Sequence, residues 1–416
     1  MTPKVKVNVY NTTDPATLLE LKREEAKIML EVVRSIHPNM RPQELINTVV
    51  LVIIKQLDVN KLILITNLKD QKKVEFTYNF PTLQSQDLSF LDHHRTTTSV
   101  TDEQEFDILR QIKAEYIIPL GRKEGGHPTA WFIIADFAES EAETLNDIIF
   151  IETLGNIMAI SLENIYLFEE KVAKELIHQE LEVAGKIQKQ SLPSTFDHHE
   201  QLDIYAYNLA HYKVAGDFYD VIPINQDELY FCIADVSGKG IAAALLVATL
   251  QANLRALVQS STSFHLIIKQ LHNVIGRITR SEHFVTLFLG RLNVRSMKMA
   301  YINAGHNPPF IVRNGTVKEL VNGCIPLGIL PIENIEIGYE QMQEGDVLFL
   351  YTDGIVEQFN PTDEMIGLES IHNHLCQIYK RSAKDIIENV LEMVWNHADT
   401  AANSDDMSLM VIKLLA

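Results

Sequence analysis

Apolar residues recur at helical spacing in the first part of the chain and then alternate with polar residues as in strands. Between residue 21 and about residue 57, two apolar stripes of helical spacing are separated by Pro38 and Pro42. Four strand-like segments follow, at residues 61–67, 74–80, 114–123 and 129–137. This order predicts two helices and then an antiparallel sheet built from two strand pairs.

A much longer helical pattern begins near Glu141 and continues to Gln190, before Pro193. Apolar residues between Ile165 and Ile187 form a stripe with charged residues between them. The stripe predicts a signalling helix that connects two domains and favours a homodimer. The alternative is a pair of ordinary helices with a break near Leu167.

From Leu202 onward, the pattern changes to strand pairs separated by helices. Residues 217–236 are typical of strand, polar turn and strand, and residues 240–258 are apolar on nearly all sides, as in a buried helix. Further strands are expected at residues 284–294, 298–304, 310–320, 345–354 and 407–415. Within one of them, Asn314 and Gly315 form the signal of a tight hairpin.

Composition and charge are those of a globular chain that attracts cations. A length of 416 residues suggests two or three domains, and a net charge of −19 argues against nucleic acid as a partner. The first residues lack the features of a signal peptide, and no uncharged apolar run reaches the roughly 18 residues of a membrane span. A cytoplasmic location without a membrane span is therefore expected.

Four aspartates lie where predicted strands begin or end: Asp217, Asp235, Asp353 and Asp405. Three of them have a glycine within a few residues, which lets backbone carbonyls approach a ligand. Asp406 follows Asp405 directly, and two adjacent carboxylates repel each other unless a cation binds. Taken singly, each aspartate has the alternative interpretation of an ordinary turn former.

Oxygen-only ligands of this kind select the hard divalent ions Mg²⁺ or Mn²⁺. Two such ions about 3.5–4 Å apart can bridge a water, lower its pKa and present hydroxide to a phosphorus centre. The sequence contains no P-loop, no G-x-S-x-G elbow and no arginine-bearing C-x5-R loop. The sequence therefore gives no motif for nucleotide-driven phosphoryl transfer or for a covalent enzyme intermediate.

Six segments, found in this order between about residue 178 and the C-terminus, resemble the SpoIIE-type, RsbU-like serine/threonine phosphatases, a bacterial branch of the metal-dependent PPM family. The segments are LEVAGKIQKQSLP, VAGDFYDV, IADVSGKGIAAAL, YINAGHNPPFIV, GDVLFLYTDGIVE and DDMSLMVIKL. Six ordered blocks are far more specific than any single short motif.

This resemblance implies an α+β fold, an αββα sandwich that holds two divalent metal ions, Mn²⁺ or Mg²⁺, at one edge of its paired sheets. By this similarity Asp217 would bridge the metals, and Asp235 would bind beside the backbone carbonyl of Val236. Asp353 and Asp405 would complete the ligand set and, with the other two aspartates, carry catalysis.

Seven further residues would support these ligands: Asp220, Gly238, Asn303, His306, Gly354, Glu357 and Asp406. Asp220 and Glu357 would hold metal-bound waters, with ordinary loop acids as the alternative. Asn303 and His306 would orient their loop near the metals; for the histidine, donation of a proton to the leaving oxygen stays open.

The first part of the chain resembles a GAF sensor domain in the order of its elements and in its closing helix. The signature of cyclic-nucleotide binders is absent, so the domain would bind an unidentified small molecule or serve only in dimerisation. The predicted organisation is a tail at 1–20, a GAF-like domain at 21–165, a connecting helix at 166–192 and a phosphatase domain at 193–416.

Together these features predict a metal-dependent phosphatase that hydrolyses phosphoserine or phosphothreonine on a protein. The resemblance implies that the substrate is a phosphorylated STAS-domain anti-sigma-factor antagonist in a partner-switching pathway, with the GAF-like domain gating activity through the connecting helix. Two alternatives remain: a catalytically silent sensor scaffold that binds a phosphorylated partner, and a phosphohydrolase that acts on a small molecule.

Overall fold

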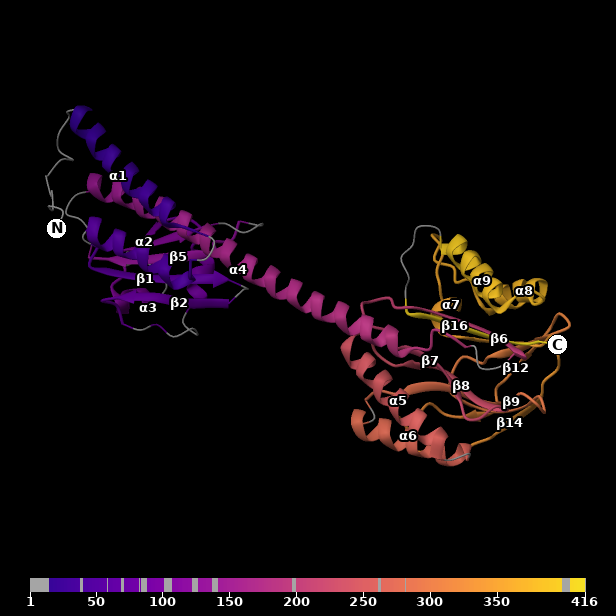
Figure 1. The fold of residues 1–416 in the computed structure, drawn as a ribbon. Helices are drawn as coiled ribbons and strands as arrows, with labels where there is room; N and C mark the ends of the chain where they lie inside the picture. The colour runs from indigo at the N-terminus through magenta and orange to yellow at the C-terminus, as the bar shows by residue number, and fades with distance from the viewer. Residues whose placement is uncertain are drawn as a thin grey trace. The chain divides into compact units, whose positions relative to one another are not determined.

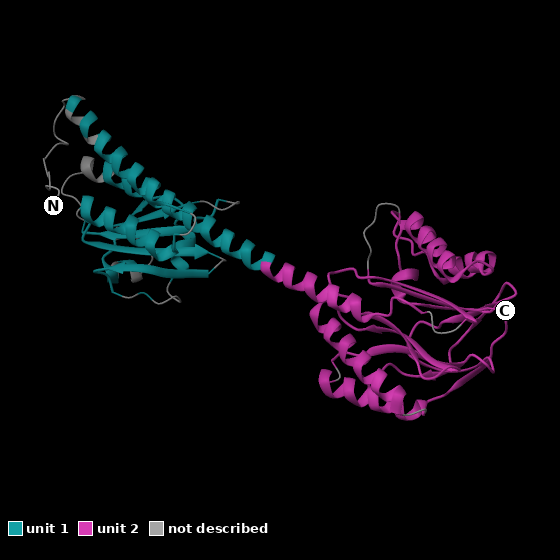
Figure 2. Cartoon of the chain, viewed as in Figure 1, with its two compact units in different colours: residues 1–175 teal, residues 176–416 magenta. Residues whose placement is uncertain are grey.

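The computed structural model divides into two compact units, residues 1–175 and residues 176–416 (Figure 2). The structure describes residues 15–37, 40–57, 59–68, 71–81, 83, 88–100, 107–121, 126–136, 141–196, 200–260, 263–280, 282–398 and 405–415. Most of the predicted N-terminal tail lies outside these residues. The division between the units falls inside a helix, ten residues beyond the domain end predicted at 165.

The first unit contains the predicted helices and strand pairs. Its elements are α1 (Pro15–Ser35), α2 (Pro42–Leu57), β1 (Lys61–Leu68), β2 (Gln71–Tyr78), a 3-10 helix (Ser89–His93), β3 (Thr98–Ser99), α3 (Asp107–Ile112), β4 (Tyr116–Leu120) and β5 (Ala130–Ala135). The strands form one antiparallel sheet in the order β2-β1-β5-β4-β3. Helix α1 begins before the predicted residue 21, at a proline, which is favourable in a first helical turn.

Both faces of this sheet are covered, as the alternation of side chains along β1 requires. Leu62 and Leu64 point to one face, where they pack with α2 and with the first part of helix α4 (Glu141–Ser191). Ile63 and Ile65 point to the other face and pack with Trp131 and with the segment between β2 and β4. The first unit therefore has a hydrophobic core on each side of its sheet.

The long helix α4 spans Glu141–Ser191 without interruption, which confirms the long helix and excludes the break near Leu167. Along it, Phe168, Val172 and Leu176 keep more than half of their surface exposed. Within the described ranges, two stretches are long and apolar enough to span a membrane by length and composition alone, Asn146–Ser191 of α4 and helix α5 (Ile241–Ser260). Core helices pass the same test, and both stretches bury apolar side chains against a sheet.

The second unit is a sandwich of two antiparallel sheets between helices (Figure 1). One sheet has the order β13-β10-β9-β8-β7, with β14 also on β10, and the other β12-β11-β15-β16-β6. The strands are β6 (Leu202–Leu209), β7 (Asp217–Pro223), β8 (Glu228–Val236), β9 (Val285–Asn293), β10 (Lys298–Ala304), β11 (Phe310–Arg313), β12 (Thr316–Glu319), β13 (Gly323–Cys324), β14 (Gly338–Gln341), β15 (Val347–Tyr351) and β16 (Met407–Leu414). Among the strands that the structure describes, β10 and β13 form the one parallel pair.

Helices cover the outer faces of both sheets, so the four layers follow the predicted αββα order (Figure 1). Helices α5 and α6 (Phe264–Thr279) pack on the first sheet, and α8 (Leu368–Ile378) and α9 (Ala383–Ala398) pack on the second. At the Asn314-Gly315 hairpin, both residues have positive φ angles, 50° and 77°, as this tight turn requires.

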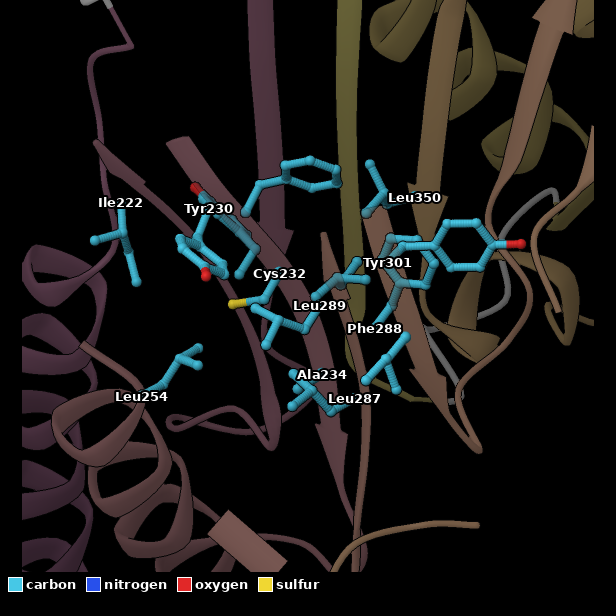
Figure 3. Close-up of a cluster of buried hydrophobic side chains, with 14 of the residues drawn as sticks. Ile222, Tyr230, Cys232, Ala234, Leu254, Leu287, Phe288, Leu289, Tyr301 and Leu350 are labelled. Atoms are coloured by element: carbon cyan, nitrogen blue, oxygen red, sulfur yellow. The ribbon is translucent and has the colours of Figure 1, made fainter. Parts of the chain in front are cut away.

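The two sheets share a buried apolar layer (Figure 3). Phe288 stacks on Tyr301 with ring centroids 5.4 Å apart, and Leu350 reaches the same cluster from the opposite sheet. This layer fixes the two sheets face to face. The positions of the strand ends, some of which carry polar residues, are consequently fixed relative to one another across the two sheets.

Candidate active site

The four predicted ligands lie on strand ends of both sheets, and a hydrogen bond joins the sheets at this place. In the first sheet Asp217, which begins β7, is the register partner of Asp235 near the end of β8. In the second sheet the end of β15 pairs with β16. The hydroxyl of Thr352, directly after β15, donates to Oδ2 of Asp217 over 2.7 Å.

The other two predicted ligands flank this contact. Asp353 is the first residue of the short helix α7 (Asp353–Val356), and Asp405 comes two residues before β16. Because β15 and β16 are neighbours, the chain that leaves one strand and the chain that enters the other lie at the same sheet edge. The fold thus brings the segments that carry all four aspartates to one end of the sandwich.

Asp406 fixes the loop that leads into Asp217. Its two carboxylate oxygens accept hydrogen bonds from the backbone N–H groups of His211 and Gly216, each over 2.6 Å. The N–H of Asp406 itself donates to the carboxylate of Asp405 over 2.9 Å. Asp406 therefore positions the backbone of this loop, whereas Asp405 lies beside the remaining carboxylates.

Electrostatics show that these carboxylates lack compensating charge. Burial and the neighbouring Asp235 raise the pKa of Asp217 well above its usual value. Burial, followed by Asp353, Asp405 and Asp406, raises the pKa of Asp235 to about 7. Burial and Asp405 also raise the pKa of Asp353. Each shift reports a carboxylate that is costly to ionise among like charges, and a bound cation would relieve that cost.

Two further charged groups stand beside this cluster. Burial, then Asp353 and Asp405, raises the pKa of Glu357, which caps the C-terminus of α7. The ammonium of Lys239 lies 2.9 Å from Oδ2 of Asp405, in an ion pair that is partly exposed on both sides. A single exposed ammonium on one carboxylate leaves most of the negative charge of the cluster unbalanced.

The donor set suits a hard divalent cation, since it consists of carboxylate and backbone oxygens. Glycines bring the backbone close: a Cβ added at Gly216 would lie 3.1 Å from the carbonyl oxygen of Val236, and one at Gly354 would lie 2.0 Å from that of Asp406. Within the described residues, no three His, Cys, Asp or Glu side chains are close enough to form a ready-made metal site. The predicted ligand set therefore stays a prediction.

The loop after Asp235 is held from a neighbouring strand. Gly238 adopts a φ of +99°, which disfavours any residue with a side chain. Ser237 exchanges backbone hydrogen bonds with the segment before β9: its N–H donates to the carbonyl of Phe284, whose N–H donates to the Ser237 hydroxyl. The predicted supporting role of Gly238 is thus compatible with a tightly fixed loop.

Asp220 lies away from the other carboxylates. It is three residues after Asp217 on the same strand, so its side chain points to the opposite face of the sheet. There Arg255 of α5 binds it with two hydrogen bonds of 2.7 and 2.9 Å. This pairing gives Asp220 a partner of its own, and the structure does not bring it to the predicted metal site.

Asn303 and His306 close the loop that follows β10. The side-chain amide of Asn303 donates to the carbonyl of His306 over 2.9 Å, and its oxygen accepts the backbone N–H of His306 over 2.7 Å. Both residues are buried. Their reciprocal hydrogen bonds give this loop a single geometry.

Three residues that contact predicted site residues or the loop before Asp217 were not identified from the sequence. Thr352 binds Asp217, and Arg255 neutralises Asp220. Gln188 of α4 uses its side-chain amide to donate to and accept from the backbone of Ala215, each over 2.8 Å. Of the three, Thr352 could have been found from the sequence, because it directly precedes Asp353 in the TDG motif. The other two act through contacts between segments that are distant in the sequence.

Comparison with known proteins supports the resemblance seen in the motifs. Residues 225–415 match the family model described as Stage II sporulation protein E (SpoIIE). The phosphoserine phosphatase RsbU of Bacillus subtilis is 26% identical over 242 residues, which cover 57% of this chain and 70% of RsbU. Protein IcfG of Synechocystis is 27% identical over 290 residues, which cover 60% of this chain but only 45% of IcfG.

Among solved structures, the SiaA-PP2C domain of Pseudomonas aeruginosa superposes with a TM-score of 0.52 at 17% identity. The superposition covers 58% of this chain and 98% of that domain. At this identity the likeness concerns the fold alone, and it places the sandwich among PP2C-type folds.

Proposed function

We propose that the C-terminal unit, in which residues 225–415 match the SpoIIE family model, is a member of the RsbU-like branch of the PPM phosphatases, and that the chain is a metal-dependent protein serine/threonine phosphatase. The observation that carries the proposal is the gathering of uncompensated carboxylates at one end of the sandwich. A raised pKa at three of the four predicted ligands is the behaviour of a site that needs positive charge.

In this proposal Asp217, Asp235, Asp353 and Asp405, with the carbonyl of Val236, hold two divalent cations, Mn²⁺ or Mg²⁺. When bound, these ions supply the positive charge that the site lacks and activate a water for attack on phosphorus. The chain itself orients the carboxylates: Thr352 holds Asp217, and Asp406 holds the loop before it. A hydrolysis of this kind requires no protein nucleophile.

We propose phosphoserine or phosphothreonine on a regulatory protein as the substrate. The support is that RsbU and RsbP of Bacillus subtilis, both similar to this chain, are named phosphoserine phosphatases. The family resemblance further suggests a STAS-domain anti-sigma-factor antagonist in a cytoplasmic partner-switching pathway. The rival proposals are a silent scaffold, which would hydrolyse nothing, and a small-molecule phosphohydrolase, which would hydrolyse p-nitrophenyl phosphate but not a phosphorylated STAS protein.

Gating by the first unit is proposed to act through the end of α4. Besides the bonds of Gln188 to Ala215, Glu182 pairs with Lys213 over 2.8 Å on the same loop. A Cβ added at Gly185 would lie only 2.0 Å from the carbonyl oxygen of Lys213. The last turns of α4 therefore contact the loop that ends at Asp217, so that a movement of this helix would reach a predicted ligand.

A substitution at the helix tests this gating directly. In Gly185→Ala, the added methyl group must displace the loop of Lys213, so we expect altered Mn²⁺ dependence of hydrolysis. Lys189→Ala, at an exposed position of the same helix, is the matched control and should behave as the wild type. Equal Mn²⁺ dependence in all three proteins would remove the proposed route.

A homodimer and a GAF-like sensor that binds an unidentified small molecule complete the proposal. The exposed apolar side chains Phe168, Val172 and Leu176 of α4 support pairing with a second copy, because each would be covered by it. Val172→Glu should then produce monomers in light-scattering measurements. A dimer of unchanged mass would show that another surface associates.

The phosphatase itself is tested by hydrolysis of p-nitrophenyl phosphate by the purified chain with EDTA, Mg²⁺ or Mn²⁺. We expect turnover with a metal, none with EDTA, and loss of turnover in Asp353→Asn. Absence of turnover under all conditions, followed by failure on a phosphorylated STAS protein, would favour the scaffold. Turnover that persists in Asp353→Asn would remove the metal assignment.

A further inference from the structure

We propose that His306 is a positioning residue that braces the two sheets at the carboxylate site, and that it is not a proton donor to the leaving group. The inference rests on the proposed phosphatase function and assigns this histidine one of its two open roles. Each of the two ring nitrogens already has a hydrogen-bond partner inside the protein.

The partners fix the tautomer of the ring. Nε2 lies 3.1 Å from the carbonyl oxygen of Tyr351, which can only accept, so Nε2 must carry the proton. In the neutral ring Nδ1 is then an acceptor, and the hydroxyl of Thr286 donates to it over 2.8 Å. Both bonds are satisfied by one assignment of hydrogens, and no ring proton is left for another group.

The ring stays neutral in this place. His306 is 4% exposed, and burial lowers its pKa to about 4. Its backbone is fixed by the reciprocal bonds with Asn303. A neutral ring whose single N–H is used by a buried carbonyl has neither the charge nor a free proton for acid catalysis.

The two bonds span the sandwich. Thr286 lies on β9 of the first sheet, where it is the register partner of Asp235 on β8. Its single hydroxyl proton is used by the 2.8 Å bond to Nδ1, and the Asp235 carbonyl lies further from the hydroxyl oxygen, at 3.3 Å. Tyr351 ends β15 of the second sheet, two residues before Asp353. One imidazole therefore connects the strand beside one predicted ligand to the strand that leads into another.

At this position the histidine acts through the hydrogen bonds of its neutral ring and not through a positive charge. The ring supplies one donor and one acceptor on opposite edges at a fixed separation, which matches a carbonyl on one sheet and a hydroxyl on the other. Residues that orient ligands in this way typically alter metal affinity or activity by about 10–100-fold when they are replaced.

The test uses the full chain, with Mn²⁺ binding measured by calorimetry and hydrolysis measured on p-nitrophenyl phosphate and phenyl phosphate. His306→Ala removes both bonds, and Thr286→Val removes only the hydroxyl while keeping the side-chain shape. We expect both variants to weaken Mn²⁺ binding, the first by about 10–100-fold, and to lose turnover by the same factor on both substrates. Because they break one brace, the double variant should be no worse than His306→Ala.

Two results would overturn the proposal. A proton donor matters most for the poorer leaving group, so a loss much larger with phenyl phosphate than with p-nitrophenyl phosphate, at unchanged Mn²⁺ affinity, would assign acid catalysis to His306. Unchanged binding and turnover in both single variants would show that the ring only fills space. If His306→Ala does not fold, the same measurements are made on Thr286→Val and His306→Gln. The glutamine can keep an N–H donor for the Tyr351 carbonyl.

These results are separable from those that test the phosphatase. If the wild type binds Mn²⁺ but hydrolyses neither substrate, the proposed function fails while calorimetry on the variants still tests the brace. If the wild type is active and the variants match it in Mn²⁺ binding and turnover, the brace fails and the phosphatase stands.

Discussion

Asp217 and Asp220 are two buried carboxylates, three residues apart on one strand, with opposite surroundings. Asp220 faces α5 and receives both arms of the Arg255 guanidinium. Asp217 faces the other sheet, where the hydroxyls of Thr352 and Ser408 act on it and Asp235 and Asp406 are its charged neighbours. Burial raises the pKa of both carboxyl groups, but Asp220 has an opposite charge beside it that counteracts this rise, whereas the like charges beside Asp217 add to it.

The charges around a buried carboxylate distinguish a structural residue from a functional one. A buried charge normally requires a partner of opposite sign, and Arg255 satisfies that requirement inside the protein. Beside Asp217 the fold places further acids, an arrangement that lowers stability unless a ligand supplies the charge.

Asp217→Asn should have the largest effect. The amide keeps the shape of the side chain and can still accept from Thr352, but it removes a charge that the proposed metals require. Turnover of p-nitrophenyl phosphate with Mn²⁺ should fall by more than the roughly 100-fold typical of residues that only support ligands. The metal-free protein should melt no lower than the wild type, because like-charge repulsion is reduced. Turnover near the wild-type rate would end the assignment of Asp217 as a ligand.

Asp235 should make the stability of the metal-free protein depend on pH. Its pKa is raised to about 7 in the folded chain, whereas an unfolded aspartate titrates near 4. Between these values the folded state holds a proton that the unfolded state has lost, so the contribution to the free energy of unfolding falls as pH rises through this window. Urea unfolding at pH 5 and pH 8 should show a fall for the wild type that is smaller in Asp235→Asn. Identical pH dependence in both would contradict the raised pKa.

Asp220→Asn should reduce stability and spare metal dependence. Without the carboxylate, Arg255 loses a charged, two-pronged partner, at a cost of about 1–3 kcal/mol in the free energy of unfolding. Hydrolysis should keep its wild-type dependence on Mn²⁺ concentration, since this side chain points away from the cluster. A large shift in that dependence would place Asp220 at the metal site after all.

Lys239→Gln should have the smallest effect. Its ion pair with Asp405 is exposed, so the free energy of unfolding should change by less than about 0.5 kcal/mol. Removal of this positive charge should tighten Mn²⁺ binding a few-fold at low salt, because the lysine competes with the cation for the same carboxylate. Weaker binding would show that Lys239 supports the site.

Local patterns in the sequence predicted most of the elements. The hairpin at Asn314-Gly315, the strand pairs of both units and the unbroken α4 all depend on spacing and turn chemistry that neighbouring residues determine. The motifs likewise led to the strand ends where the acids gather. Where the prediction differed, as at the start of α1, the periodic apolar signal began later than the helix itself.

Contacts between distant segments could not be predicted in the same way. Which face of β7 meets α5 decides that Asp220, and not Asp217, is paired with Arg255, 35 residues further along. The capture of the His211 and Gly216 N–H groups by Asp406 joins segments 195 and 190 residues apart. Such pairings follow from the packing of whole layers, which no local window of sequence contains.

The most direct measurement is the Mn²⁺-induced change in melting temperature for the wild type, Asp217→Asn and Asp220→Asn. A ligand that binds only the folded state at 100 times its dissociation constant stabilises by about 2.7 kcal/mol. We predict a clear rise for the wild type, the same rise from a lower starting point for Asp220→Asn, and none for Asp217→Asn. An equal rise in Asp217→Asn, or none in the wild type, would contradict the metal site on which the proposed function depends.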